Sequence, residues 1–146
     1  MAVTKNDPNT IYLGGERVQI NDLAVSEAVT PGHLVERFNN AGVIRFRKHT
    51  TGGGDTARLV ATEQLMVGRG VDDDYAANDL VEVSAGQAGA HFWMFIASGQ
   101  DIAAGDLLES AGNGTLAILA SGKALFSALE NKPTVTALTR IRVEVV

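Results

Sequence analysis

The sequence contains no cysteine, which excludes disulfide bonds, a thiolate nucleophile and any cysteine-ligated metal site. It also lacks a long apolar run: the longest, residues 92–97, has the length of a strand, far below the roughly 20 residues of a membrane-spanning helix. The N-terminal residues show no apolar stretch of the kind found in secretory signals. We therefore expect neither a disulfide-stabilised scaffold nor a membrane partner.

Positive charge is also scarce, because the net charge of the 146 residues is −5. A cationic face is needed to attract phosphates, so we expect no direct binding to nucleic acid. The charges are unevenly distributed: residues 37–58 hold five basic residues and one acid, whereas residues 72–109 hold eight acids and no Lys or Arg. This asymmetry is compatible with ordinary solvated faces or with complementary surfaces that steer docking or self-association.

Glycine, by contrast, is abundant, with 16 residues scattered between short apolar runs. Short apolar runs separated by Gly-containing turns are typical of an all-β sandwich or barrel. The helical spacing of Leu125, Ala128 and Leu129 predicts one short helix near 123–130, with Ser121 as its cap and Pro133 after its end. The predicted strands are Arg17–Ile20, Leu34–Phe38, Val43–Lys48, Arg58–Thr62, Leu80–Ser84, His91–Ala97, Leu107–Ser110, Thr115–Leu119 and Arg140–Val146.

Three segments of the sequence repeat one local pattern: Pro31–Glu36, Ala77–Glu82 and Ala104–Glu109. In each, a small residue or Pro precedes Gly or Asn, and a polar residue, two aliphatic residues and a Glu follow. The Gly or Asn suits the position of a tight turn that requires a positive φ. Asn/Gly turns at 39–42 and 112–114 then lead into return strands, so we expect recurrent β-hairpins that close a small barrel or sandwich.

Four longer stretches, in this order and spacing, resemble the small capsid decoration (cement) proteins of tailed bacteriophages. They are Ala28–Glu36, Gly68–Tyr75, Ile102–Leu116 and Arg140–Val145, and the similarity covers roughly residues 24–146. The resemblance implies a single compact β-barrel domain over 24–146, of the type called a β-tulip, with a short helix. Residues 1–23 match the family less clearly, and we expect them to form an N-terminal arm or an edge strand.

The resemblance also implies a function. Members of the family are made in the host bacterial cytoplasm and bind the outer surface of the expanded capsid, commonly as homotrimers. There they stabilise contacts between neighbouring major capsid proteins. By this resemblance the partners of the chain would be the major capsid protein and further copies of itself, with a dimer as the alternative to a trimer. Other structural roles in the virion, such as the base of a head fibre, and a carbohydrate-binding β-domain remain as alternatives.

The sequence contains no recognisable catalytic constellation. His33, His49 and His91 lie far apart and lack metal-ligand spacing, so we expect structural roles for them, no metal, no cofactor and no enzymatic activity. The acidic run Asp72, Asp73, Asp74 lacks the pattern of an EF-hand. We interpret it as a solvated loop, or as a salt-bridging contact to the basic residues of a neighbouring subunit.

Partner contacts are expected on three segments: the N-terminal arm, the basic segment of residues 37–58 and the acidic segment of residues 72–109. The N-terminal segment contains β-forming residues that can add a strand to a partner's sheet or form an edge strand of its own barrel. Trp93, the single tryptophan, lies in the most apolar predicted strand and fits either the core or a subunit interface. The candidate contact residues are Ile11, Tyr12, Leu13, Arg17, Arg45, Arg47, Lys48, Asp72, Asp73 and Asp74.

Overall fold

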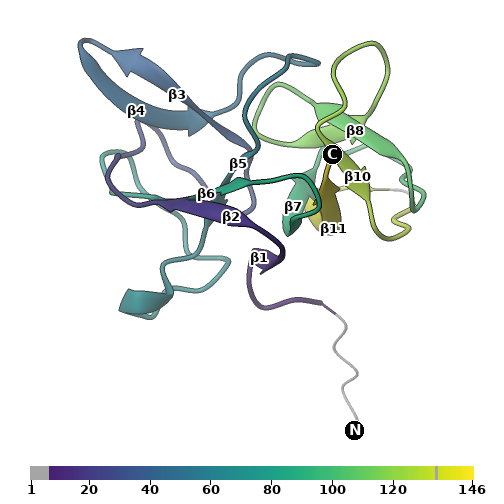
Figure 1. Ribbon diagram of the computed structural model, residues 1–146, viewed down its shortest axis with the longest axis horizontal. Helices are drawn as coiled ribbons and strands as arrows, with labels where there is room; N and C mark the ends of the chain where they lie inside the picture. Colours follow the sequence, from purple (N-terminus) through teal and green to yellow (C-terminus); the bar gives the residue numbers. More distant parts are fainter. Residues whose placement is uncertain (1–6, 134) are drawn as a thin grey trace, which may run out of the picture.

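The computed structural model describes residues 7–133 and 135–146, and these form an all-β protein (Figure 1). Over these residues the helical structure consists of one 3₁₀ turn, η1 (Leu65–Val67), and no helix is long and apolar enough to cross a membrane. The strands are β1 (Tyr12–Gly14), β2 (Arg17–Ile20), β3 (Val35–Asn40), β4 (Val43–Lys48), β5 (Leu59–Thr62), β6 (Glu82–Gly86), β7 (His91–Ile96), β8 (Leu107–Ser110), β9 (Leu116–Ile118), β10 (Phe126–Ala128) and β11 (Thr139–Val145).

Strands β7 to β11 form a small closed barrel, which confirms the predicted fold class. The neighbours run β7-β11-β10-β8-β9, and β9 returns to β7 through a parallel pairing of Ile96 with Leu116. All other pairings are antiparallel, so the barrel is mixed. β1 pairs with the start of β7, next to the barrel, as an edge strand of the same sheet. Closure leaves the β7–β9 seam without a free edge, which protects it from unwanted strand pairing.

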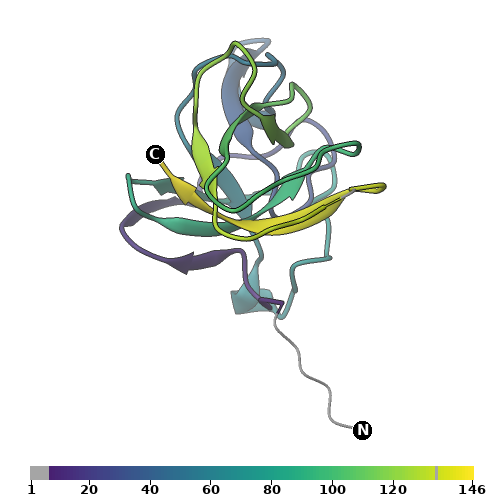
Figure 2. The same cartoon turned by 90° about the vertical axis from the view of Figure 1, so that its right-hand side faces the viewer.

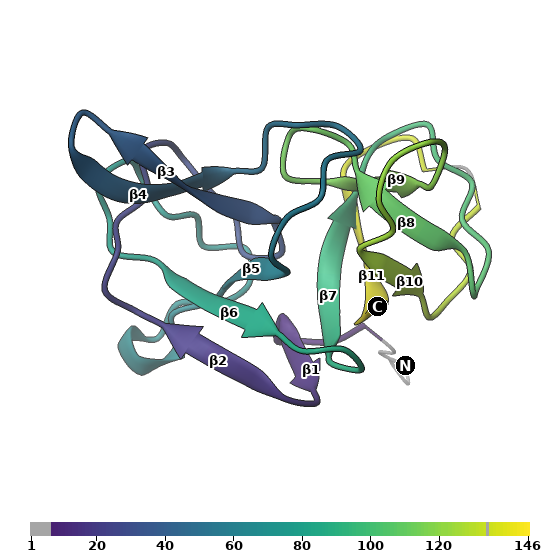
Figure 3. The ribbon, with the colours of Figure 1, turned by 45° about the horizontal axis from the view of Figure 1, so that its top comes forward.

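The preceding strands form a second unit, which we call the flanking lobe (residues 17–86). It consists of the three-stranded sheet β2-β6-β5 and the hairpin β3–β4. Figure 3 shows this lobe beside the barrel, with the hairpin above the sheet. Each unit has its own hydrophobic core.

The two cores are joined by strand segments whose side chains alternate between them. Leu34 belongs to the barrel core, whereas Val35 belongs to the core of the flanking lobe. In β5, Val60 points to the barrel core and Ala61 to the lobe core. Because successive side chains of a strand point to opposite faces, one short segment can contribute to both cores.

The nine predicted strands are all present, with ends that differ by at most two residues. The last strand alternates in the sequence between apolar and charged residues, and its apolar residues Ile141, Val143 and Val145 are buried. Residues 92–96 are apolar on both faces of their strand and lie in the interior of the sheet, since β7 pairs with β1, β9 and β11. Figure 2, turned by 90°, shows the long strand β11 crossing the molecule below the other barrel strands.

The helix predicted near 123–130 is wrong. Phe126–Ala128 form β10, which pairs with β8 on one side and β11 on the other. Phe126 and Ala128 are buried while Ser127 between them is only half-buried, which is the period of a strand. The apolar run is too short for its period to distinguish helix from strand, and barrel closure decides the outcome.

The hairpin β3–β4 departs from expectation at its tip. Ile44 shares a face with Phe46, as its alternation predicts, but Ile44 is 45% exposed whereas Phe46 is fully buried. The hairpin extends beyond the body of the lobe (Figure 1), so only its base covers the core. The tip turns through Ala41 and Gly42, both at positive φ.

The repeated sequence pattern corresponds to one repeated turn. Gly32, Asn78 and Gly105 all have positive φ, as the pattern predicts. In each turn the residue that follows the Gly or Asn accepts a hydrogen bond through its side chain, from the backbone N–H three positions earlier. The acceptors are His33 Nδ1 at 3.1 Å, Asp79 Oδ2 at 2.9 Å and Asp106 Oδ2 at 2.8 Å. Such side-chain bonds fix a turn without secondary structure.

Candidate interaction surface

The basic segment of residues 37–58 lies mainly on the protruding hairpin β3–β4. Arg47 bonds to Glu36 at 3.0 Å, and its guanidinium covers the ring of Phe38. Burial alone would raise the pKa of Glu36, but hydrogen bonds from Thr50 and Arg47 outweigh it and hold that pKa below its usual value. Arg47 is therefore engaged within its own chain.

The remaining cations of the hairpin lack an acidic partner among the described residues. Arg45 donates to the Asn78 side chain at 2.7 Å, and Arg37 is exposed. The backbone N–H of Lys48 donates to the Glu27 carboxylate. The side-chain ammonium group of Lys48 makes no ion pair with any described residue. The hairpin thus presents a positively charged, partly apolar tip.

The acidic run Asp72, Asp73, Asp74 is held by its own chain. Asp72 pairs with Arg140 at 3.0 Å, Asp73 accepts the Gly70 N–H at 2.6 Å, and Asp74 accepts the Thr30 hydroxyl at 2.8 Å. The carboxylates remain accessible, because the Asp72 side chain is 88% exposed. Within the described residues no three His, Asp or Glu side chains gather in a way that could hold a metal ion.

Arg140, which sequence reasoning missed, connects this acidic loop to the barrel. Its side chain is only 8% exposed, and it donates to the Pro31 and Val71 carbonyls as well as to Asp72. Its guanidinium also lies over the Phe95 ring, 4.4 Å from the centroid. Half-buried Trp93 contacts the same guanidinium and packs against the barrel core. The signal in the sequence was a basic residue on the polar side of the last strand, which does not distinguish a solvated side chain from a buried one.

The candidate residues near the N-terminus have different environments. Ile11, predicted as a contact residue, is fully buried in the barrel core of the chain. Tyr12 and Leu13 are half-buried on the edge strand β1. Arg17 covers the Tyr12 ring at 3.9 Å and donates to Ser84 at 2.8 Å. The part of the predicted arm in residues 1–6 lies outside the described residues.

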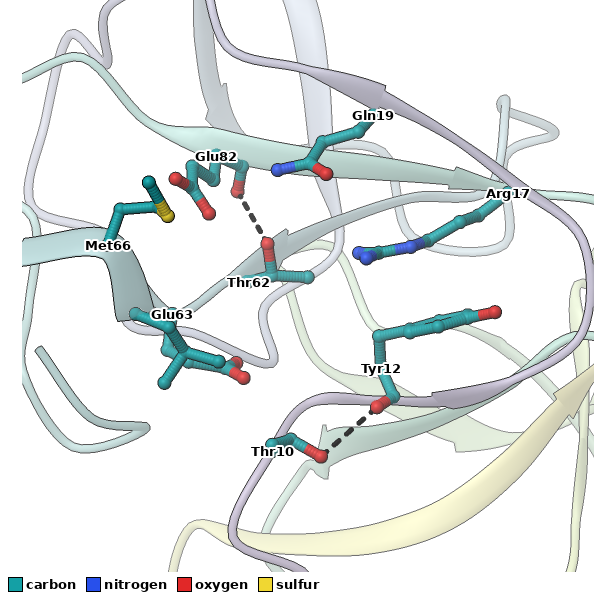
Figure 4. Close-up of a pocket in the computed structure, with 9 residues that line it drawn as sticks. Thr10, Tyr12, Arg17, Gln19, Thr62, Glu63, Met66 and Glu82 are labelled. Carbon is teal, nitrogen blue, oxygen red and sulfur yellow. Dashed lines mark hydrogen bonds between the residues drawn. The ribbon is translucent and has the colours of Figure 1, made fainter. Parts of the chain in front are cut away.

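Beside β1 lies a cleft of about 300 Å³, which we call the acidic cleft (Figure 4). Glu63 and Glu82 both line it, together with Arg17. Burial and the neighbouring Glu63 raise the pKa of Glu82, and Arg17 opposes this rise only in part. The full lining consists of Thr10, Tyr12, Arg17, Gln19, Thr62, Glu63, Leu65, Met66 and Glu82.

Two histidines are buried and serve the fold. Burial, Lys48 and Arg140 lower the pKa of His33 to about 4 although Asp74 opposes them, and its ring contacts Phe95. His49 Nδ1 lies 2.6 Å from the Ser110 hydroxyl, and burial lowers its pKa against the effect of Glu36. Ser110 is 1% exposed and also accepts the Gly112 N–H, so this pair fastens the chain after β4 to β8.

The geometry defines a class of protein: a closed five-stranded mixed barrel with a flanking lobe that carries a protruding hairpin. No protein-family model matches the sequence, and no curated protein matches it either. Among solved structures, the fold is similar to the N base of the head fibre protein gp8.5 of bacteriophage phi29. The TM-score is 0.61 at 14% sequence identity, over 90% of this chain and 95% of the other. The two proteins therefore share a fold.

Proposed function

We propose that this chain is a structural protein of a tailed-phage virion that binds the outer surface of the head. In the form we favour it is a decoration protein that acts as a homotrimer and stabilises contacts between major capsid proteins. The single observation that carries the proposal is the agreement of two independent likenesses. The ordered sequence motifs resemble capsid decoration proteins, and the fold is similar to a head fibre base.

The surface chemistry supports a binding role over a catalytic one. The two best-positioned polar pairs, His49 with Ser110 and Arg140 with Asp72, act within the fold. The exposed groups are instead a basic hairpin, an acidic loop and apolar side chains. A subunit that engages several identical sites on a lattice gains avidity from modest contacts of this kind.

The fold likeness specifically favours a second candidate, the base of a head fibre. Both candidates bind a head, but they differ in what binding does. A cement protein raises the temperature at which the capsid loses its contents, because it bridges capsid subunits and binds the intact lattice preferentially. A fibre base that contacts one capsid subunit does not bridge neighbours, so we expect it to stabilise the lattice far less.

The test is to mix the purified chain with expanded capsids that lack it and to measure co-sedimentation and capsid melting. The proposal predicts saturable binding with density at symmetry axes of the lattice in electron microscopy. Stabilisation of the capsid identifies a cement protein, and its absence identifies a fibre base. Binding that is absent or does not saturate overturns both.

A pair of variants with the same change in net charge tests the acidic loop as a capsid contact. Asp73→Asn/Asp74→Asn keeps an oxygen acceptor for Gly70 and Thr30 but removes two charges. Asp22→Asn/Asp101→Asn removes the same charge from exposed positions elsewhere. We expect several-fold weaker capsid binding and a weaker salt dependence only for the first variant. Equal behaviour of the two variants removes the loop from the contact surface.

A further inference from the structure

The three most exposed large apolar side chains of the described residues form a small projection at η1, the apolar knob (Leu65, Met66, Val67). Their exposures are 60%, 92% and 66%. A left-handed Gly68 ends the turn, and the Gln64 side chain fastens it to the Leu80 carbonyl. The turn is thus a fixed structure whose side chains cover no part of either core. Fixed and exposed apolar groups of this kind mark interaction sites.

Leu65 and Met66 also form one wall of the acidic cleft, so an apolar surface and a charged cavity are continuous. Glu63 is 6% exposed, and its Oε2 accepts the Ile11 N–H at 3.1 Å. Neither Glu63 nor Glu82 forms an ion pair within the described residues. Arg17 donates to Ser84 instead, and in Figure 4 it lies over Tyr12.

This charge balance indicates what would complete the cleft. Two carboxylates share one guanidinium, which leaves a net charge of about −1 in a partly buried site. A buried carboxylate is stabilised by a cation that brings its own hydrogen-bond donors. The complementary partner is therefore a segment that carries a cation next to apolar side chains.

The chain itself offers such a segment. The tip of the β3–β4 hairpin presents Val43 and Ile44, which are 55% and 45% exposed. Arg37 and Arg45 flank them without an acidic partner in the described chain. In Figures 1 and 3 the hairpin and η1 lie at opposite sides of the flanking lobe, so they do not contact each other within one chain.

We propose that the apolar knob and acidic cleft of one copy receive the β3–β4 hairpin tip of a second copy. Ile44 packs against Leu65 and Met66, and Arg37, on the same face of the hairpin as Ile44, enters the cleft. Because two different surfaces meet, the contact is head-to-tail, and we propose that its repetition around an axis closes a ring and does not extend into a filament. This inference deepens the self-association in the proposed function and rests on it.

The test is the solution mass of the full chain, measured by sedimentation over a range of concentrations. The wild type is expected to form a closed oligomer. Met66→Ser is expected to raise the dissociation constant about ten-fold or more, because it removes an exposed contact without touching the core. The matched control is Leu138→Ser, at a 53% exposed apolar position in the loop before β11, which should leave the mass unchanged.

A charge exchange then identifies the two surfaces. Arg37→Glu and Glu82→Lys should each weaken the oligomer, and the chain that carries both should recover, because every interface regains opposite charges. Circular dichroism of each variant shows that it is folded. A monomeric wild type, an oligomer insensitive to Met66→Ser, or no recovery in the double variant overturns the inference. Capsid binding measured on the same samples tests the proposed function separately, since a monomer that binds capsids contradicts the head-to-tail contact alone.

Discussion

The barrel and the flanking lobe are both built from short strands and tight turns, but they differ in whether their strands close on themselves. The barrel closes on itself through the parallel β7–β9 pairing. The flanking lobe stays open: β2 is an edge strand, the hairpin β3–β4 projects, and the five most exposed large apolar side chains of the described residues all belong to it. They are Met66, Val67, Leu65, Val18 and Leu80. This difference underlies our proposal that the barrel provides stability and the lobe provides contact surface.

The largest expected effect comes from the barrel core. Phe92→Ala should lower the free energy of unfolding by about 4 kcal/mol, since its ring is fully buried against Tyr12 and leaves no room for a side chain at Gly86. Phe46→Ala, at an equally buried position of the lobe, should cost about 3 kcal/mol, because the projecting hairpin can collapse onto the space. Urea denaturation measures both, and a larger loss for Phe46→Ala breaks the comparison.

The next effect concerns the connection between the two units. Arg140→Met should cost about 3 kcal/mol, because the Pro31 and Val71 carbonyls and the Asp72 carboxylate lose their donor. The unfolding transition should also broaden as the acidic loop detaches from β11. Lys123→Met, at an exposed cation outside the proposed contact surfaces, is the control and should stay close to the wild type. A sharp transition with little loss in Arg140→Met means that the two units are joined by their cores alone.

The third effect is a loss of stability in acid. The folded pKa of His33 is about 4 against an ordinary 6.5, so between these values the unfolded chain binds a proton that the folded chain does not. Stability is therefore full above pH 6.5 and falls toward pH 4 by about 2 to 3 kcal/mol.

The matched variant for this effect is His33→Asn. The asparagine side chain retains an oxygen that can accept the Thr30 N–H. Asp79 and Asp106 accept the corresponding backbone N–H in the two other turns of the same pattern. The variant should be less stable than the wild type at pH 7, because the ring contact with Phe95 is lost, and its stability should depend less on pH. Thermal unfolding at several pH values tests this, and unchanged pH dependence contradicts the role of His33.

The smallest effect compares the same turn in both units. Asp106→Ala and Asp79→Ala each remove one side-chain acceptor for a backbone N–H and should each cost about 1 kcal/mol. Asn at either position keeps an acceptor and should cost less. Thermal unfolding of the four variants provides the measurement, and a large difference between the two turns contradicts their equivalence.

Local features of the fold could be predicted from the sequence. Alternation located the last strand, and the repeated pattern located the positive φ of Gly32, Asn78 and Gly105. These features depend on neighbours along the chain. The strand at 126–128 was missed because its period is too short to distinguish it from a helix, and its pairing with β8 and β11 decides it.

The candidate site was less predictable, since it depends on contacts distant in sequence. Ile11 has the same apolar character whether it faces a partner or the core, and only its position beside β7 shows that it is buried. Arg140 has no local signal for its contacts with Pro31 and Asp72, which are more than 60 residues away. The acidic cleft joins β1, β2, β6 and η1, so no single motif marks it.

The proposed structural role on a phage head is tested most directly by mass spectrometry of virus particles purified from cultures that produce the chain. The account predicts many copies per particle, in a fixed ratio to the major capsid protein. Protease added to intact virions should cleave the chain before the capsid protein, because the proposal places the chain on the outer surface. Absence of the chain from purified particles, or trace amounts without a fixed ratio, contradicts the account.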